Sequence, residues 1–218
     1  MIEQLLLPSV VSAEAFDDIA GEPVFPGEEQ VVARAVDSRR REFVTARRCA
    51  REALAKLGIP PAPILPGPRR EPIWPAGVVG AITHCAGYRA AAVARNGELT
   101  ALGIDAEPDA PLPEGVSEAV TVAGEPAMLA ALSRADPSIH WGRLLFSAKE
   151  SVFKAWYPLT GRMLDFVEAE LTIDPAARTF RARLLVDGRR TDGGPPLTGF
   201  AGRFLTARGM VLTAVTVP

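Results

Sequence analysis

Proline and glycine are the residues that most limit how this chain can fold. Its 218 residues include 20 prolines and 19 glycines. Proline interrupts helices and central strands, and glycine favours turns, so these residues divide the chain into short elements. The densest stretch, residues 59–77, is a proline-rich loop that can hold no long helix. The chain is therefore divided into many separate elements, and it shows no internal repeat.

Three segments show helical spacing of apolar residues. Residues 38–57 predict a helix because Phe43 begins a series at helical spacing and Gly58 supplies a stop. A second helix is predicted from about residue 141 to 156, and a weaker one over 125–134. The first helix also carries six arginines on its other faces, at positions 39, 40, 41, 47, 48 and 51.

Seven runs have the composition of strands. Two of them, residues 89–95 and 99–105, are joined by Asn96-Gly97, which predicts a hairpin. Helices and strands in the first half are followed by helices and strands in the second, which favours an α+β fold with two halves over a doubly wound sheet. We expect the halves to be residues 1–110 and 111–218. The other predicted strands are 78–83, 166–173, 180–186, 198–207 and 210–217.

Composition excludes several classes of protein. The formal net charge is −2 and the pI is near 5.8, which argues against a nucleic-acid-binding protein. No apolar run approaches the roughly 20 residues of a membrane span, and the first residues lack the basic region of a signal peptide, so we expect a cytoplasmic protein. The cysteines (Cys49, Cys85) and histidines (His84, His140) lack the spacing of a zinc site. Any metal must therefore be held by oxygen ligands.

The segment GIDAE, residues 103–107, places two carboxylates on one strand. Side chains alternate along a strand, so Asp105 and Glu107 point to the same side, about 7 Å apart. They would repel each other unless a cation lay between them, and Mg²⁺ favours such ligands together with substrate phosphates. The alternative is a solvated strand end before Pro108.

Three further groups of residues could contact an anion. Glu150 and Lys154 are four residues apart on one helix face, which suits either a surface ion pair or part of a metal and phosphate site. Thr83 and His84 end a predicted strand, where they are either structural or hold a phosphate. The arginines of the first helix, with Arg69 and Arg70 of the loop, are either a solvated face or an anion site.

The order of these segments resembles the 4′-phosphopantetheinyl transferase family. GIDAE followed by FSAKESVFKAW, residues 146–156, is similar to the family signature of a G-I/V-D-x-E strand and a K-E-x-x-x-K helix. Upstream, ITHCAGYRAAAVA and REPIWPAG resemble the family's S/T-H segment and the entry to it. The resemblance covers roughly residues 35–165. It is strongest to the monomeric two-lobed class of the surfactin-synthetase activating enzyme, in its actinobacterial form.

The resemblance implies two similar lobes related by pseudo-twofold symmetry, with the active site at their interface. It implies that Asp105, Glu107 and Glu150 bind Mg²⁺ at the pyrophosphate of coenzyme A, with Lys154 on the same phosphates and Lys149 nearby. Many relatives carry a lysine near Pro66, and which of Arg69 or Arg70 replaces it is left open. The nucleotide end would be held by Arg39, Arg47, Thr83 and His84, with His84 on the 3′-phosphate.

The implied reaction transfers the phosphopantetheine arm of coenzyme A to a serine of an apo acyl or peptidyl carrier protein, releasing 3′,5′-ADP. Asp105, Glu150 and Lys154 would be the catalytic residues, and either Glu150 or a water on the metal would accept the serine proton. The resemblance also implies a monomer that serves fatty-acid, polyketide or nonribosomal peptide synthesis. Two alternatives are a Mg²⁺-dependent nucleotide phosphohydrolase and a noncatalytic coenzyme A-binding module.

Overall fold

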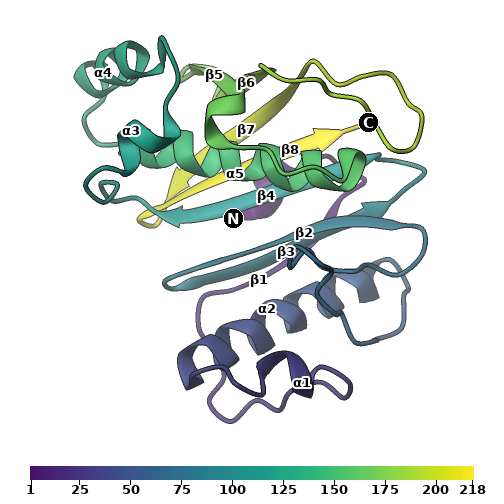
Figure 1. Ribbon diagram of the computed structural model, residues 1–218. Helices are drawn as coiled ribbons and strands as arrows, with labels where there is room; N and C mark the ends of the chain where they lie inside the picture. Colours follow the sequence, from purple (N-terminus) through teal and green to yellow (C-terminus); the bar gives the residue numbers. More distant parts are fainter.

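The computed structural model describes residues 1–218, which form an α+β fold built on two antiparallel sheets (Figure 1). The first sheet has the strand order β1-β3-β2, with β1 at Val11–Ala15, β2 at Val78–Cys85 and β3 at Tyr88–Arg95. The second has the order β4-β8-β7-β6-β5. Its strands are β4 (Ala101–Pro108), β5 (Ala169–Asp174), β6 (Thr179–Leu184), β7 (Gly199–Ala207) and β8 (Met210–Val217).

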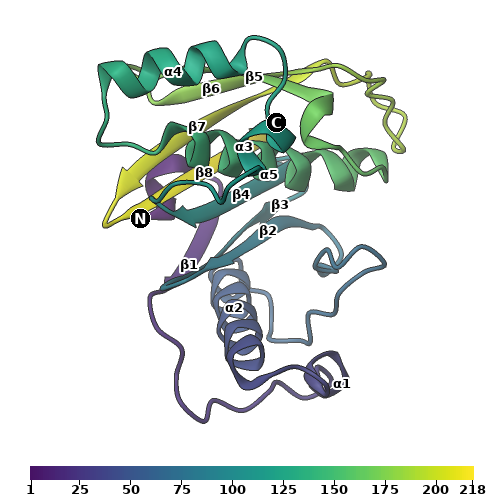
Figure 2. The ribbon, with the colours of Figure 1, turned by 60° about the vertical axis from the view of Figure 1, so that its left-hand side comes forward.

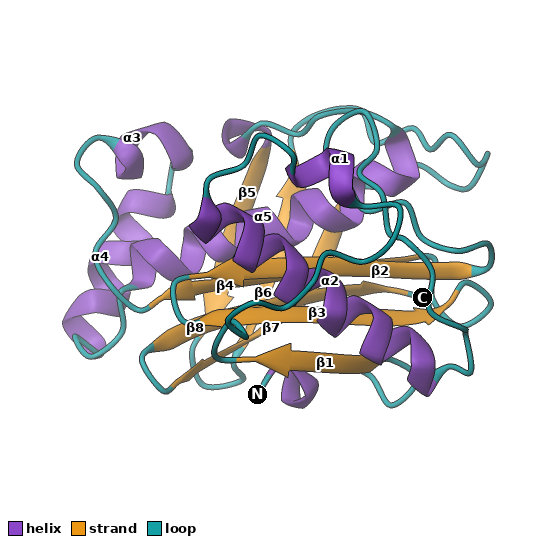
Figure 3. Ribbon diagram, turned by 90° about the horizontal axis from the view of Figure 1, so that it is seen from below, coloured by secondary structure: helices purple, strands orange, loops and turns teal.

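One long helix packs on each sheet. Helix α2 (Asp37–Lys56) lies across β1 and β3, as Figure 3 shows from below, and α5 (Trp141–Thr160) lies against β4 and β8. The view in Figure 2 shows the resulting order of layers, with the three-stranded sheet between α2 and the second sheet. The shorter helices are η1 (Ile2–Leu5), α1 (Glu29–Val32), α3 (Val116–Val120), α4 (Glu125–Ala135) and η2 (Phe166–Glu168).

Small side chains let the two sheets pack closely. Every residue of β3 except Arg95 is buried, because α2 covers one face of the strand and the second sheet covers the other. The face of β3 toward the second sheet carries Ala90, Ala92 and Ala94, which pack in one core with residues such as Ile104 of β4 and Leu212 of β8. Strand β4 therefore lies between the two halves and contacts both β2 and α5.

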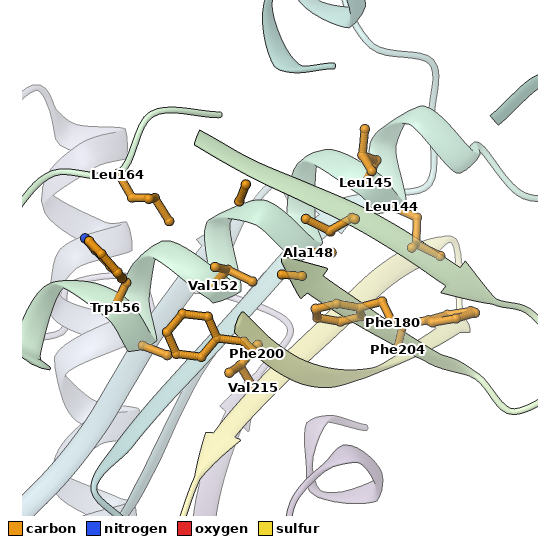
Figure 4. Close-up of a cluster of buried hydrophobic side chains, with 14 of the residues drawn as sticks. Leu144, Leu145, Ala148, Val152, Trp156, Leu164, Phe180, Phe200, Phe204 and Val215 are labelled. Carbon is orange, nitrogen blue, oxygen red and sulfur yellow. The ribbon is translucent and has the colours of Figure 1, made fainter. Parts of the chain in front are cut away.

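A larger core lies between α5 and the five-stranded sheet (Figure 4). Leu144, Ala148 and Val152 recur at helical spacing on the buried face of α5. They pack with aromatic residues of the sheet such as Phe180 and Phe204. Burying this apolar stripe fixes the rotation of α5 about its axis, and so decides which of its polar residues face the site.

The structure confirms the three predicted helices as α2, α4 and α5, and it places strands in all seven predicted runs. The hairpin predicted at Asn96-Gly97 is wrong. Strand β3 is paired with β1 and β2 on its two edges, so it has no free edge for β4, which pairs with β8 instead. The turn that closes the β2–β3 hairpin is at Ala86-Gly87, where Gly87 has a φ of 74°. Sequence analysis also missed β1.

The chain thus passes from one sheet to the other between β3 and β4, ahead of the boundary at residue 110 expected from the sequence. That boundary, and a pseudo-twofold relation between the halves, stay predictions. No helix of the protein has the length and apolar character needed to cross a membrane.

Candidate active site

A cleft of about 1190 Å³ opens between the two halves. One wall comes from α1, α2, β2 and the proline-rich loop, and the other from the second half of α5. Glu71 is the only acidic residue in its lining. An excess of cations in the cleft of a chain with a net charge of −2 favours binding of an anion there. The cations are Arg34, Arg39, Arg47, Arg69, Arg70 and Lys154.

Arg39 and His84 meet at one end of this cleft. Nη1 of Arg39 lies 2.9 Å from Nε2 of His84 and donates to Oε2 of Glu42 at 2.8 Å. Burial lowers the pKa of His84, and the charge of Arg39 lowers it further. The structure therefore brings together two of the residues that the resemblance assigned to the nucleotide end.

Arg47 lies about two helical turns after Arg39 on α2 and also lines the cleft. Its Nε donates to the carbonyl of Ile64 at 2.9 Å, and its guanidinium lies 4.7 Å from the centre of the Phe43 ring. Burial lowers its pKa to about 10, so it remains a cation at neutral pH. A fixed and largely desolvated cation attracts an anion more strongly than one in water.

Arg69 and Arg70 line the rim of the cleft on a small closed loop. The loop is held by the bridge between Pro66 and Pro72 and by hydrogen bonds from Gly67 N to Glu71 O and from Arg70 N to Gly67 O. Arg70 adopts a φ of 69°, a left-handed conformation that costs free energy for a residue other than glycine. Both arginines stay candidates for the phosphate contact.

Asp105 is almost fully buried where β4, β2 and α5 meet. Its Oδ1 accepts from Lys154 Nζ at 2.7 Å and from Thr83 Oγ1 at 3.2 Å. Thr83 in turn accepts from the backbone N–H of Ala106 at 3.0 Å. The hydroxyl of Thr83 thus points at Asp105, where it positions the carboxylate, and Thr83 does not line the cleft.

The second oxygen of Asp105, Oδ2, is buried and has no hydrogen-bond partner. A buried carboxylate oxygen without a donor is costly, and a cation would satisfy it. Burial raises the pKa of both Glu107 and Glu150, and the negative charge of Asp105 raises each further. Positive charge nearby therefore does not fully compensate the carboxylates of Asp105, Glu107 and Glu150. Because Mg²⁺ prefers oxygen ligands, it fits this set of carboxylates.

The three carboxylates nevertheless do not form one cluster in this structure. Glu107 and Asp105 both pair with cations of α5, but with different ones. Glu107 pairs with Arg143 at 3.1 Å, whereas Asp105 pairs with Lys154. Glu150 faces a smaller cavity of about 120 Å³ that adjoins the cleft at Phe153. No group of three histidine, cysteine or acidic side chains is placed to hold a metal ion. The predicted metal set therefore stays a prediction that requires these side chains to move together.

Lys149 is not brought to the cleft. Its ammonium donates to Glu125 at 2.9 Å and to the carbonyls of Val120 and Phe166, which uses all three of its donors. Only 2% of its side chain is exposed, and burial lowers its pKa. Helix α5 turns by about 100° per residue. Because Lys149 and Lys154 are five residues apart on this helix, their side chains point to different sides of it. Lys149 ties α3, α4 and η2 together.

Sequence reasoning missed several residues of the site. Glu42, three residues after Arg39, could have been found from the helical i, i+3 spacing. Arg143 gave no signal, because its contact with Glu107 is formed only in the folded chain. Phe153 and Tyr157 were not singled out, but they form part of the cleft wall on α5.

The fold and the cationic lining of the cleft suit a phosphorylated or otherwise polyanionic ligand between the two halves. Residues 27–94 match the 4′-phosphopantetheinyl transferase N-terminal domain, and residues 101–192 match the 4′-phosphopantetheinyl transferase superfamily. The junction of these two matches coincides with the change of sheet between β3 and β4.

Curated relatives match the whole chain. The chain is 56% identical to the 4′-phosphopantetheinyl transferase Svp of Streptomyces mobaraensis, over 100% of this chain and 89% of the relative. It is 49% identical to Npt of Nocardia iowensis (99% of each chain) and 46% identical to PptT of Mycobacterium tuberculosis (97% and 98%), both 4′-phosphopantetheinyl transferases. The chain belongs to the 4′-phosphopantetheinyl transferase family and is a transferase.

Proposed function

We propose that this enzyme transfers the phosphopantetheine arm of coenzyme A to a serine of an apo acyl or peptidyl carrier protein, with Mg²⁺ at the pyrophosphate. The observation that supports this most is that two features lie along a single cleft. One is the cationic end at Arg39 and His84. The other is Lys154, which pairs with the buried carboxylate of Asp105, and Oδ2 of that carboxylate has no hydrogen-bond partner. Coenzyme A carries two phosphate groups that such a cleft could hold, the 3′-phosphate of the nucleotide and the pyrophosphate.

The chain's own residues would act mainly by position and charge. Arg39, Arg47 and His84 would hold the nucleotide end, and Lys154 would neutralise charge on the pyrophosphate oxygens as the bond to the leaving 3′,5′-ADP breaks. Asp105, Glu107 and Glu150 would hold Mg²⁺, which when bound supplies further charge neutralisation. The serine attacks the β-phosphorus, and Glu150 or a water molecule takes up its proton.

The cleft takes its residues from both halves of one chain, which supports a monomer as the working unit. The test is to incubate the protein with coenzyme A, Mg²⁺ and apo carrier proteins from fatty-acid, polyketide and peptide synthesis, and to weigh each carrier by mass spectrometry. We expect a carrier to gain one phosphopantetheine group and 3′,5′-ADP to appear in equal amount. Glu52→Gln, an exposed position on α2 outside the cleft, is the control variant.

The outcome also separates the alternatives. Cleavage of coenzyme A with no change in the mass of any carrier would indicate a phosphohydrolase. Binding of coenzyme A without cleavage would indicate a noncatalytic binding module. The set of carriers that gain mass defines the pathway that the enzyme serves.

A further inference from the structure

Glu42 lies at the centre of the polar network behind the cationic end of the cleft. Its Oε2 accepts from Arg39 at 2.8 Å and lies 3.6 Å from Nδ1 of His84. Its Oε1 lies 3.8 Å from Nη2 of Arg89, which is itself paired with Asp18 at 2.9 Å. Glu42 is not part of the cleft lining, so it acts on a ligand only through the side chains it contacts.

The contact between Arg39 and His84 determines where the proton of His84 lies. An arginine side chain only donates hydrogen bonds, so Nε2 of His84, 2.9 Å from Arg39 Nη1, must be an acceptor. The ring is therefore neutral in this state and carries its proton on Nδ1. That nitrogen is the one that faces the carboxylate of Glu42.

A phosphate that binds at His84 needs a different form of the ring. Phosphate oxygens are acceptors, so Nε2 must become a donor, and it must take a proton from solvent while Arg39 turns its N–H toward the phosphate. The ring then carries protons on both nitrogens. A carboxylate beside Nδ1 stabilises that cation, as the acidic partner of a histidine commonly does.

We infer that Glu42 is a positioning residue that fixes the proton of His84 on Nδ1 and allows the ring to take up a second proton when the 3′-phosphate of coenzyme A binds. The inference rests on the proposed function for its ligand. It adds that binding of coenzyme A is coupled to proton uptake, and that this coupling depends on a carboxylate that does not touch the ligand.

The charges around His84 give the direction of the coupling. Arg39 on α2, Lys154 on α5 and Arg89 on β3 all disfavour the cationic ring, whereas the carboxylate of Glu42 favours it. Burial and Arg39 hold the pKa of His84 below its usual 6.5 in the free protein. A bound phosphate raises that pKa, so between the free and the bound value the affinity for coenzyme A falls as pH rises.

The experiment measures the ring directly. Nuclear magnetic resonance of the histidine side chains gives the pKa of His84 in the free protein and in complexes with coenzyme A and with dephospho-coenzyme A, which lacks the 3′-phosphate. Since His140 is the only other histidine, a His140→Gln background assigns the signals. Calorimetry in buffers of different ionisation enthalpy counts the protons taken up on binding. The variants are Glu42→Gln, Glu42→Asp and the control Glu52→Gln.

We expect the unmodified protein to take up protons with coenzyme A and not with dephospho-coenzyme A. In the complex of Glu42→Gln the pKa of His84 should lie about one pH unit lower, and proton uptake near neutral pH should fall. Glu42→Asp, which keeps the charge, should restore part of the uptake, and Glu52→Gln should match the unmodified protein. Melting temperatures of all variants show whether each is folded.

Two results would overturn the inference. One is equal proton uptake in folded Glu42→Gln and in the unmodified protein. The other is uptake that is the same with and without the 3′-phosphate. Failure of the proposed function gives a different result, because then the unmodified protein transfers no phosphopantetheine to a carrier, whatever His84 does.

Discussion

Lys154 on α5 and Asp105 on β4 form an ion pair of 2.7 Å that joins the helix to the strand at the edge of the cleft. Lys154 also donates to the carbonyl of Ile104 at 3.0 Å, so it is held at two points of the strand. The pair uses one oxygen of Asp105 and leaves the other without a partner. The ion pair thus stabilises the packing of α5 on β4. It also leaves Oδ2 of Asp105 available to a cation.

Asp105→Ala should both destabilise the metal-free protein and abolish transfer. The substitution removes the acceptor of Lys154 and Thr83, and losing a buried charged hydrogen-bond partner costs about 1–3 kcal/mol. Asp105→Asn, which keeps the volume, should cost less stability but lose transfer by orders of magnitude. Denaturant unfolding and the carrier mass assay measure the two effects. Near-normal transfer by Asp105→Asn would show that the carboxylate has no role in the reaction.

Gly103→Ala should separate α5 from β4. A Cβ at this position would lie 2.0 Å from the backbone carbonyl oxygen of Ser151, and a backbone atom cannot rotate away. We expect a loss of about 1–3 kcal/mol in the free energy of unfolding, together with lower activity because Asp105 and Lys154 no longer meet. Gly97→Ala is the matched control, since a Cβ there meets nothing within 4 Å. Equal stability of the two variants would contradict this packing.

Lys149→Met should act on stability and not on the affinity for coenzyme A. The change leaves Glu125 buried without its cation, which typically costs about 3–5 kcal/mol. Lys56→Met, at an exposed position on α2 where the ammonium donates only to the carbonyl of Ser12, should cost less, about 0.5–1.5 kcal/mol at most. Below the unfolding transition the KM for coenzyme A should stay unchanged. A raised KM with unchanged stability would instead place Lys149 at the ligand.

Both thiols should be unreactive in the folded protein. Burial raises the pKa of Cys49 to about 11 and that of Cys85 to about 12. At pH 8 the thiolate fraction of Cys49 is then on the order of one in a thousand, and only the thiolate reacts. Reaction with a thiol reagent should be slow at pH 8, faster as pH approaches 11, and complete for two cysteines in denaturant. Fast labelling of either cysteine at pH 8 would indicate local opening of the core around that thiol.

Much of the local structure could be predicted from the sequence. Apolar spacing and glycine stops define α2 and α5 because helix formation depends on residues three and four apart. The GIDAE segment predicted strand β4, and it predicted that Asp105 and Glu107 point to the same side of that strand. This prediction was possible because the alternation of side chains along a strand is also a local property. The arginines of α2 indicated an anion site, and two of them, Arg39 and Arg47, line the cleft.

The tertiary structure alone decided how these pieces meet. The pairing of β4 with β8, more than 100 residues later, depends on which strand edges remain free after the chain has folded, and no local pattern encodes that. The same holds for the Glu107–Arg143 pair and for the burial of Lys149, whose ammonium is enclosed by its contacts with Val120, Glu125 and Phe166. Local spacing fixes what each segment is, whereas burial of the apolar faces fixes where each polar side chain points.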